Sequence, residues 1–130
     1  MAHYINIANK KTNIMKNTIV ETPEFISRAR SVLSSEEIKD LIDYLSDYPE
    51  AGDLITGTGG VRKLRWQRKG MGKRGGSRVI YFYYNDCIPL FLLTVYAKNQ
   101  KSDLAESQKS ELREILQDLV KQYMKGDQND

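Results

Sequence analysis

The second half of the chain alternates between hydrophobic and polar positions, which is the pattern of strands. Residues Val61 to Gln67 read VRKLRWQ, so a strand there turns Leu64 and Trp66 toward the core. The same alternation turns Lys63 and Arg65 toward the opposite face. This segment therefore predicts a strand with one apolar face and one cationic face.

Three other segments are also predicted to be strands. Ser77 to Tyr84 is rich in aromatic and β-branched residues, so we expect it to pair with the preceding strand as a hairpin. Ile88 to Ala97 is apolar on both faces, which is typical of a central strand. Ile14 to Glu21 is short and β-branched, and it predicts a strand near the start of the chain.

Helical patterns flank these strands. Pro23 suits the first turn of a helix, and Ser34 and Glu37 have the spacing of a capping box at the start of a second helix. These two helices predict a helical hairpin that ends at Tyr48. Ser107 to Met124 has the periodicity of an amphipathic C-terminal helix. The order of elements favours an α+β fold in which an antiparallel sheet of about four strands packs with the helical hairpin and the C-terminal helix.

The chain has 130 residues, which fits one domain with a single modest core. Its first residues are polar, and Met15 comes just before the first regular element. We therefore expect a flexible extension at residues 1–14, a folded domain at residues 15–125 and a disordered tail at residues 126–130.

Composition excludes several classes of protein. Hydrophobic residues make up 40% and charged residues 28% of the chain, as in an ordinary globular protein. No apolar run is long enough to cross a bilayer, and the start lacks the apolar region of a signal peptide, which favours a cytoplasmic protein with no membrane partner. Cys87 is the single cysteine, so an internal disulfide is excluded, and Cys87 with His3 is too few for a Cys/His zinc site.

The net charge of +3 conceals a strong segregation of charge along the chain. The 32 residues between Asp53 and Asp86 contain no acid and eight cations, whereas the other 98 residues hold 12 basic and 17 acidic side chains. The same block contains seven of the nine glycines. Cations on glycine-rich turns favour a surface that contacts phosphates.

Several chemistries do not fit the residues present. A serine or cysteine nucleophile needs a histidine base, and His3 lies in the expected extension. Gly70 to Gly75 matches G-x-G-x-x-G by spacing, but a strand follows it where a dinucleotide site needs a helix. No acidic cluster suggests a divalent cation. We therefore expect no metal and no cofactor.

A cationic strand face with tyrosines nearby suits phosphodiester chemistry. Fixed positive charge stabilises a phosphorane-like transition state. Crowded cations also lower one another's pKa, so a lysine in such a cluster could act as a general base toward an RNA 2′-hydroxyl. Without such a base the same surface would bind the RNA backbone and stack its bases. The residues alone leave binding and catalysis both open.

Four segments of the chain resemble the RelE/HigB toxins of type II toxin–antitoxin systems. The segments are Val61–Trp66 (VRKLRW), Gly72–Tyr81 (GKRGGSRVIY), Leu93–Asn99 (LTVYAKN) and Ser102–Leu104 (SDL). The second and third together are fairly specific to the HigB-like branch. The similarity covers roughly Met15 to Tyr123, and the order of elements agrees with it.

This resemblance implies a RelE-like microbial RNase fold and a ribosome-dependent endoribonuclease, an mRNA interferase. In such toxins the 2′-hydroxyl attacks the adjacent phosphate, which leaves a 2′,3′-cyclic phosphate and a 5′-hydroxyl. The implied partners are a cognate antitoxin protein, messenger RNA and the ribosome with its ribosomal RNA. Two alternatives stay open, namely a non-catalytic RNA- or ribosome-binding module and a ParE-like inhibitor of DNA gyrase.

The resemblance also assigns candidate site residues. The candidate catalytic residues are Lys63, Arg65, Arg78 and Lys98. The candidate RNA- or ribosome-binding residues are Arg62, Arg68, Lys69, Lys73, Arg74, Tyr81 and Lys101. The best-studied relatives carry an arginine and a tyrosine where this chain has Asn99 and Ala105, and a histidine used by some HigB relatives is absent. Lys63 is the first choice for the base, and Tyr81 and Tyr96 are the nearby tyrosines.

Overall fold

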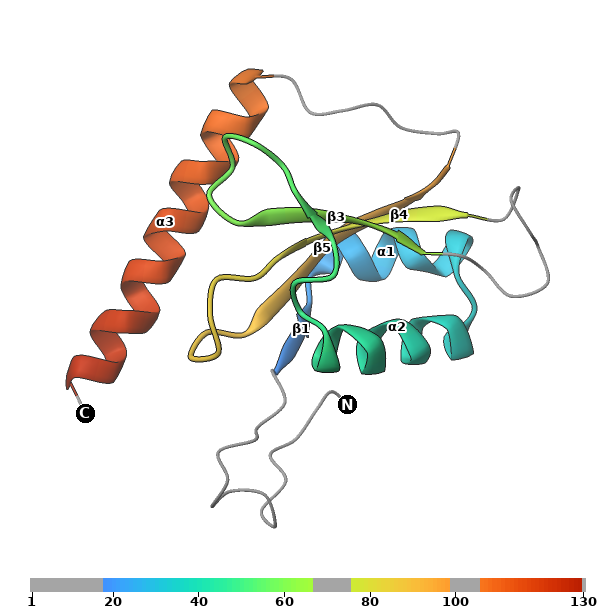
Figure 1. Cartoon of the computed structure of the whole chain (residues 1–130), viewed down its shortest axis with the longest axis horizontal. Coiled ribbons are helices and arrows are strands. Elements are labelled where there is room, and N and C mark those ends of the chain that lie inside the picture. Colours follow the sequence, from blue (N-terminus) through green and yellow to red (C-terminus); the bar gives the residue numbers. More distant parts are fainter. Residues whose placement is uncertain (1–17, 67–75, 99–105, 130) are drawn as a thin grey trace, which may run out of the picture.

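A computed structural model describes residues 18–66, 76–98 and 106–129 of the chain. The helices and strands, in chain order, are β1 (Ile19–Glu21), α1 (Pro23–Val32), α2 (Ser35–Asp47), β2 (Asp53–Leu54), β3 (Val61–Trp66), β4 (Ser77–Phe82), β5 (Leu90–Ala97) and α3 (Glu106–Asn129). The architecture is α+β, as the hydrophobic pattern predicts. Figure 1 shows α1 and α2 below β3 and β4, and α3 across the left-hand end of the sheet.

The five strands form one sheet in the order β1-β5-β4-β3-β2. Neighbouring strands in the series β2, β3, β4 and β5 pair antiparallel, as the predicted hairpins require. The prediction of a purely antiparallel sheet of about four strands is wrong, because β1 pairs parallel with β5, with Ile19 opposite Leu90. Two helices and three strands separate β1 from β5 in the chain, so no hairpin turn determines their relative direction. The sheet is therefore mixed.

Both helices in the N-terminal half begin at caps that satisfy their first backbone N–H groups. The hydroxyl of Thr22 accepts a hydrogen bond from the Phe25 N–H (3.3 Å), and Pro23 occupies the first turn of α1. The capping box of α2 is confirmed: the Glu37 N–H donates to Ser34 Oγ (3.1 Å), and the Ser34 N–H donates to Glu37 Oε1 (2.8 Å).

The C-terminal helix is longer than its periodicity predicts. It runs from Glu106 to Asn129, whereas the apolar repeat indicates Ser107 to Met124. The helix thus extends into the range 126–130, where the sequence predicts a disordered tail. The expected extension at residues 1–14 lies outside the described residues. Within the described ranges, no helix is both long and apolar enough to span a membrane.

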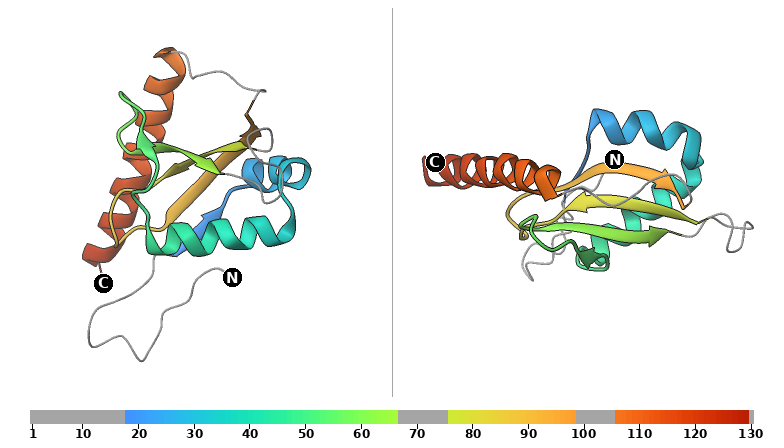
Figure 2. Two further views of the ribbon diagram at one scale, coloured as in Figure 1. Left: turned by 45° about the vertical axis from the view of Figure 1, so that its right-hand side comes forward. Right: turned by 90° about the horizontal axis from the view of Figure 1, so that it is seen from above.

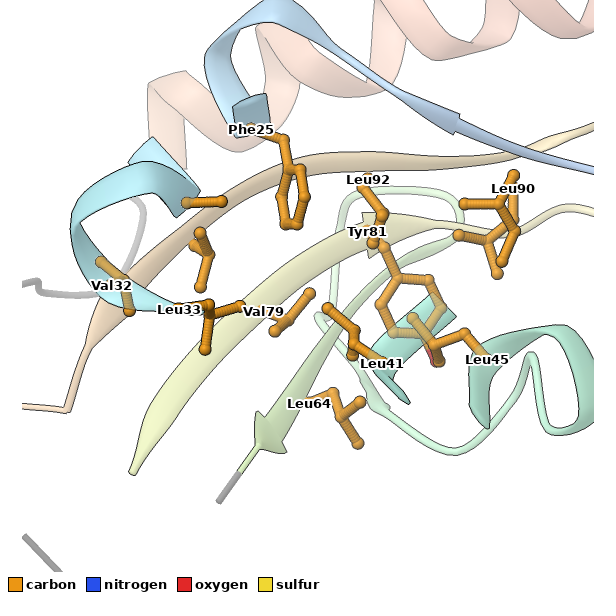
Figure 3. Close-up of a cluster of buried hydrophobic side chains, with 13 residues drawn as sticks. Phe25, Val32, Leu33, Leu41, Leu45, Leu64, Val79, Tyr81, Leu90 and Leu92 are labelled. Atoms are coloured by element: carbon orange, nitrogen blue, oxygen red, sulfur yellow. The ribbon is translucent and has the colours of Figure 1, made fainter. Parts of the chain in front are cut away.

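Each face of the sheet has its own hydrophobic cluster. On one face, α1 and α2 bury Phe25, Leu41 and Leu45 against the strands (Figure 3). On the other face, Leu116 of α3 packs against a cluster that includes Val61, Ile80, Phe82 and Tyr96. Both views in Figure 2 place α3 at one end of the strands. This end is where β3 begins and β4 ends, so the other end of that face has no helix from the described residues over it.

Candidate cationic site on the open half of the sheet

Two arginines lie directly opposite each other on β3 and β4. Arg65 is paired in register with Arg78, and Arg78 is paired in turn with Tyr96 of β5. Side chains at paired positions share one face of a sheet, with Cβ atoms roughly 5 Å apart. Arg65, Arg78 and Tyr96 therefore form a row across three strands. We call this row, together with Lys63 and Lys98, the cationic site.

Like charges at directly opposed positions destabilise a strand pair. Within the described part of the chain, neither Arg65 nor Arg78 forms an ion pair. The Arg78 guanidinium donates one hydrogen bond, from Nη1 to the carbonyl oxygen of Ser77 (3.3 Å). Arg65 is exposed and Arg78 is partly exposed. The pair is therefore accessible to an anion, whose charge would offset the repulsion.

Lys63 and Lys98 border this arginine pair. Lys63 precedes Arg65 by two residues and so lies on the same face, diagonal to Arg78 at roughly 7–8 Å between Cβ atoms. Lys98 follows β5, and its backbone N–H donates to the Gly76 carbonyl oxygen (3.0 Å). This bond ties the end of β5 to the residue before β4. The strand register thus brings together all four predicted catalytic positions.

The buried ends of β3 and β4 hold the arginine pair in place. Ser77 is fully buried, and its hydroxyl donates to the carbonyl oxygen of Trp66 (3.0 Å) across the strand pair. The pairing of Trp66 with Ser77 lies one position beyond that of Arg65 with Arg78. This packing restrains the backbone next to both guanidinium groups.

The two faces of the sheet carry opposite charge. The α2 helix lies on the face opposite the cationic site, and five of its residues are acidic, namely Glu36, Glu37, Asp40, Asp43 and Asp47. Lys39 is its one basic residue. A polyanion would therefore be attracted to the open face and repelled by the α2 face.

Two of the predicted RNA-contacting residues have structural roles. Tyr81 is fully buried on the α1 and α2 face, where its hydroxyl donates to the Pro49 carbonyl oxygen (2.8 Å) and accepts from the Gly52 N–H (2.8 Å). Burial raises the pKa of the Tyr81 phenol, so the hydroxyl stays protonated and able to donate. This burial argues against a contact with RNA, and we remove Tyr81 from the candidate set.

Arg62 is also removed from the candidate set, because its guanidinium group is hydrogen-bonded within the fold. Its Nη1 donates to the carbonyl oxygens of Glu50 (3.1 Å) and Gly52 (2.7 Å), and its Nη2 lies 4.0 Å from the Glu50 carboxylate. The side chain is 15% exposed. Arg62 therefore fastens the segment before β2 to β3 and is not free to bind a ligand.

The remaining predicted contacts lie outside the described residues. These are Arg68, Lys69, Lys73 and Arg74 between β3 and β4, and Lys101 after β5. The sequence names Tyr96 only as a nearby tyrosine, and the structure adds its position across from Arg78, which depends on the register of β4 with β5. The alternation of β5 could have indicated its face but not its partner. Among the described residues, no cluster of His, Cys, Asp or Glu could hold a metal ion.

A comparison with protein families agrees with this arrangement. The model of the family described as the RelE toxin of the RelE / RelB toxin-antitoxin system matches residues 17–127. The chain belongs to the RelE toxin family. It is thus a toxin of a toxin–antitoxin system, and the family implies a cognate antitoxin as its partner. The matched segment of this RelE-family toxin includes the whole sheet and the cationic site.

Proposed function

We propose that this RelE-family toxin is an endoribonuclease that cleaves messenger RNA on the ribosome. The observation that carries the proposal is the pair of the exposed Arg65 and the partly exposed Arg78, which has no carboxylate partner among the described residues. Two opposed arginines do not stabilise the fold. They would stabilise the negative charge that develops on a phosphodiester during cleavage. Lys63 lies beside the pair, where a base is needed.

The proposed reaction uses the RNA's own 2′-hydroxyl as the nucleophile. Lys63 is the proposed base that accepts the 2′-hydroxyl proton as the 2′-oxygen bonds to phosphorus. The bond from phosphorus to the 5′-oxygen breaks, and that oxygen takes up a proton, which leaves a 2′,3′-cyclic phosphate and a 5′-hydroxyl. Arg65 and Arg78 stabilise the charge on the phosphoryl oxygens. Tyr96 is a positioning residue, because it flanks Arg78 and is 7% exposed.

Ribosome dependence is proposed from the distribution of charge along the chain. The cationic site lies where β3 ends and β4 begins, and the segment that joins them, residues 67–75, contains four cations. This concentration of cations in one part of the sequence, next to the cationic site, favours a large polyanion such as ribosomal RNA. The acidic α2 helix on the other face would be repelled by ribosomal RNA, which would orient the toxin with its cationic site toward the RNA.

The direct test compares an RNA oligonucleotide containing one preferred site with the same RNA carrying a single 2′-deoxy substitution there. We expect cleavage of the first and none of the second, with a cyclic phosphate and a 5′-hydroxyl as new ends. Translating ribosomes should raise the rate, and Lys63→Ala should abolish it. Lys39→Ala removes one cation from the α2 face and serves as the control.

Three outcomes would contradict the proposal. Cleavage of the 2′-deoxy RNA would exclude the 2′-hydroxyl as nucleophile. Binding to ribosomes without any cut would favour a non-catalytic binding module. Inhibition of DNA supercoiling by gyrase without any cut RNA would favour the ParE-like alternative.

Arg65→Ala is expected to reduce the salt dependence of RNA binding. Each phosphate contact contributes a slope of about −0.7 to the plot of log K against log salt for a single strand. The variant should therefore lower the magnitude of the slope by about that amount for a binding site of any sequence. Fluorescence anisotropy at several salt concentrations measures it, with Lys39→Ala as the matched charge control. Equal slopes for the wild type and Arg65→Ala would exclude a phosphate contact by this residue.

A further inference from the structure

A second concave site lies at the other end of the sheet, under α3. It is a cavity of about 440 Å³ between α3, the turn after β2 and the end of β4. Its lining includes Gly59, Phe82, Tyr84, Arg113, Gln117 and Lys121. Phe82 is four residues along β4 from Arg78, which corresponds to roughly 13 Å. The cavity is thus separate from the cationic site, and its volume falls in the range of small-molecule pockets, roughly 300–1,000 Å³.

One wall of the cavity is a polar ridge on α3. Arg113, Gln117 and Lys121 are spaced by four residues, so they lie along one side of the helix over about 12 Å. Among the residues that the structure describes, no acidic side chain lines the cavity. In the described part of the chain, neither Arg113 nor Lys121 is in an ion pair. The α3 helix therefore presents two cations and an amide to the cavity, beside the apolar side chains of Leu116 and Val120.

The opposite wall is aromatic. The rings of Phe82 and Tyr84 are stacked, with centroids 6.5 Å apart and an angle of 25° between their planes. Phe82 is 1% exposed, whereas Tyr84 is 50% exposed. Phe82 thus supports the Tyr84 ring from the protein side and leaves part of that ring open to a ligand.

The Arg113 side chain is held in position by a glycine. Gly59 has a φ of +79°, and a Cβ there would lie 3.4 Å from Cγ of Arg113. The stem of Arg113 therefore packs on the backbone of Gly59, whose positive φ is a conformation that residues other than glycine rarely adopt. This contact fixes the stem of Arg113 against the turn after β2, and the side chain lines the cavity while it stays exposed to solvent.

We propose that this cavity binds a nucleotide, with its base against Tyr84 and its phosphate between Arg113 and Lys121. A flat aromatic wall facing a cationic ridge is the arrangement that accepts a base and its phosphate together. The site acts in binding only, so it does not depend on RNA cleavage. The nucleotide is either part of an RNA strand or a free mononucleotide, and the two sources share this chemistry.

Amide chemical shifts locate binding in the full-length protein. The Gly59 amide reports on the cavity, and the Gly76 amide reports on the cationic site. The probes are adenosine 5′-monophosphate, a 2′-O-methyl RNA trinucleotide that cannot be cleaved, and tripolyphosphate. We expect saturable shifts at Gly59 with the nucleotides and much weaker ones with tripolyphosphate. A stronger effect of the trinucleotide assigns the site to RNA, and a stronger effect of the mononucleotide assigns it to a free nucleotide.

Two pairs of variants test the residues. Arg113→Ala with Lys121→Ala should weaken the Gly59 response about 10- to 100-fold, whereas Arg30→Ala with Lys39→Ala removes equal charge from α1 and α2 and should leave it within about twofold. Tyr84→Ala should weaken it about 10-fold, and Tyr84→Phe should retain it. Thermal unfolding verifies that each variant is folded.

The proposal is overturned if no nucleotide shifts Gly59, if tripolyphosphate binds as well as the trinucleotide, or if the cavity variants bind like the wild type. A toxin that cuts no RNA but still binds nucleotides at Gly59 would refute the proposed nuclease and leave this site standing. Normal RNA cleavage without a response at Gly59 would support the proposed nuclease and refute the nucleotide site.

Discussion

Replacing Arg78 by alanine is expected to lower the rate of RNA cleavage by about 10²–10³, which corresponds to about 2.7–4 kcal/mol of transition-state stabilisation. The reason is its central place in the cationic site, with Arg65 on one side and Tyr96 on the other. The measurement is the single-turnover rate on a ribosome-bound message.

Two further variants distinguish the role of the Arg78 guanidinium group from the effect of removing a positive charge. Arg78→Lys retains the charge but lacks the planar fork that binds two phosphoryl oxygens, so it should recover only part of the rate. Arg30→Ala removes an exposed arginine of α1 and should have no effect. Because Arg78 is partly exposed and makes one hydrogen bond to its neighbour's backbone, its loss should change the free energy of unfolding little. Wild-type cleavage by Arg78→Ala would refute the proposed site.

The largest effect on stability is expected at Tyr81. Its ring is fully buried, and Gly52 packs so closely that a Cβ there would lie 2.9 Å from Cε1 of the ring. Tyr81→Ala leaves a cavity and should lower the free energy of unfolding by about 3–5 kcal/mol. Tyr81→Phe retains the ring but leaves the Pro49 carbonyl and the Gly52 N–H without their partner. That variant should lose about 1–3 kcal/mol.

Denaturant unfolding measures both losses, and Tyr83→Phe is the matched control. The Tyr83 hydroxyl donates to the Asp86 carboxylate (2.7 Å) in an exposed position, so its removal should cost less than about 1 kcal/mol. The cleavage rate per folded molecule should be unchanged in Tyr81→Phe. A large loss of rate without a loss of stability would place Tyr81 in the site after all.

Much of the local structure follows from short stretches of sequence. The capping box at Ser34 and Glu37 needs two side chains three residues apart, so the start of α2 could be predicted. The two strands that carry the arginine pair were also predictable, because alternation and a connecting turn define a hairpin. The direction of β1 relative to β5 could not be predicted, because the chain between these two strands runs through two helices and three other strands. A two-residue strand such as β2 has no periodicity to detect.

Some features of the candidate site could be predicted from the sequence, and others depend on the tertiary structure. Alternation along β3 determined that Lys63 and Arg65 share a face, because successive side chains of any strand point to opposite sides. Only the tertiary structure decided that Arg65 meets Arg78 and that Arg78 meets Tyr96, since register depends on packing between strands. Tertiary contacts also removed Arg62 and Tyr81, whose polar groups bond to backbone that is distant in the chain. Which residues are cationic is written in the sequence, but which of them stay available to a ligand depends on the partners that folding brings to each one.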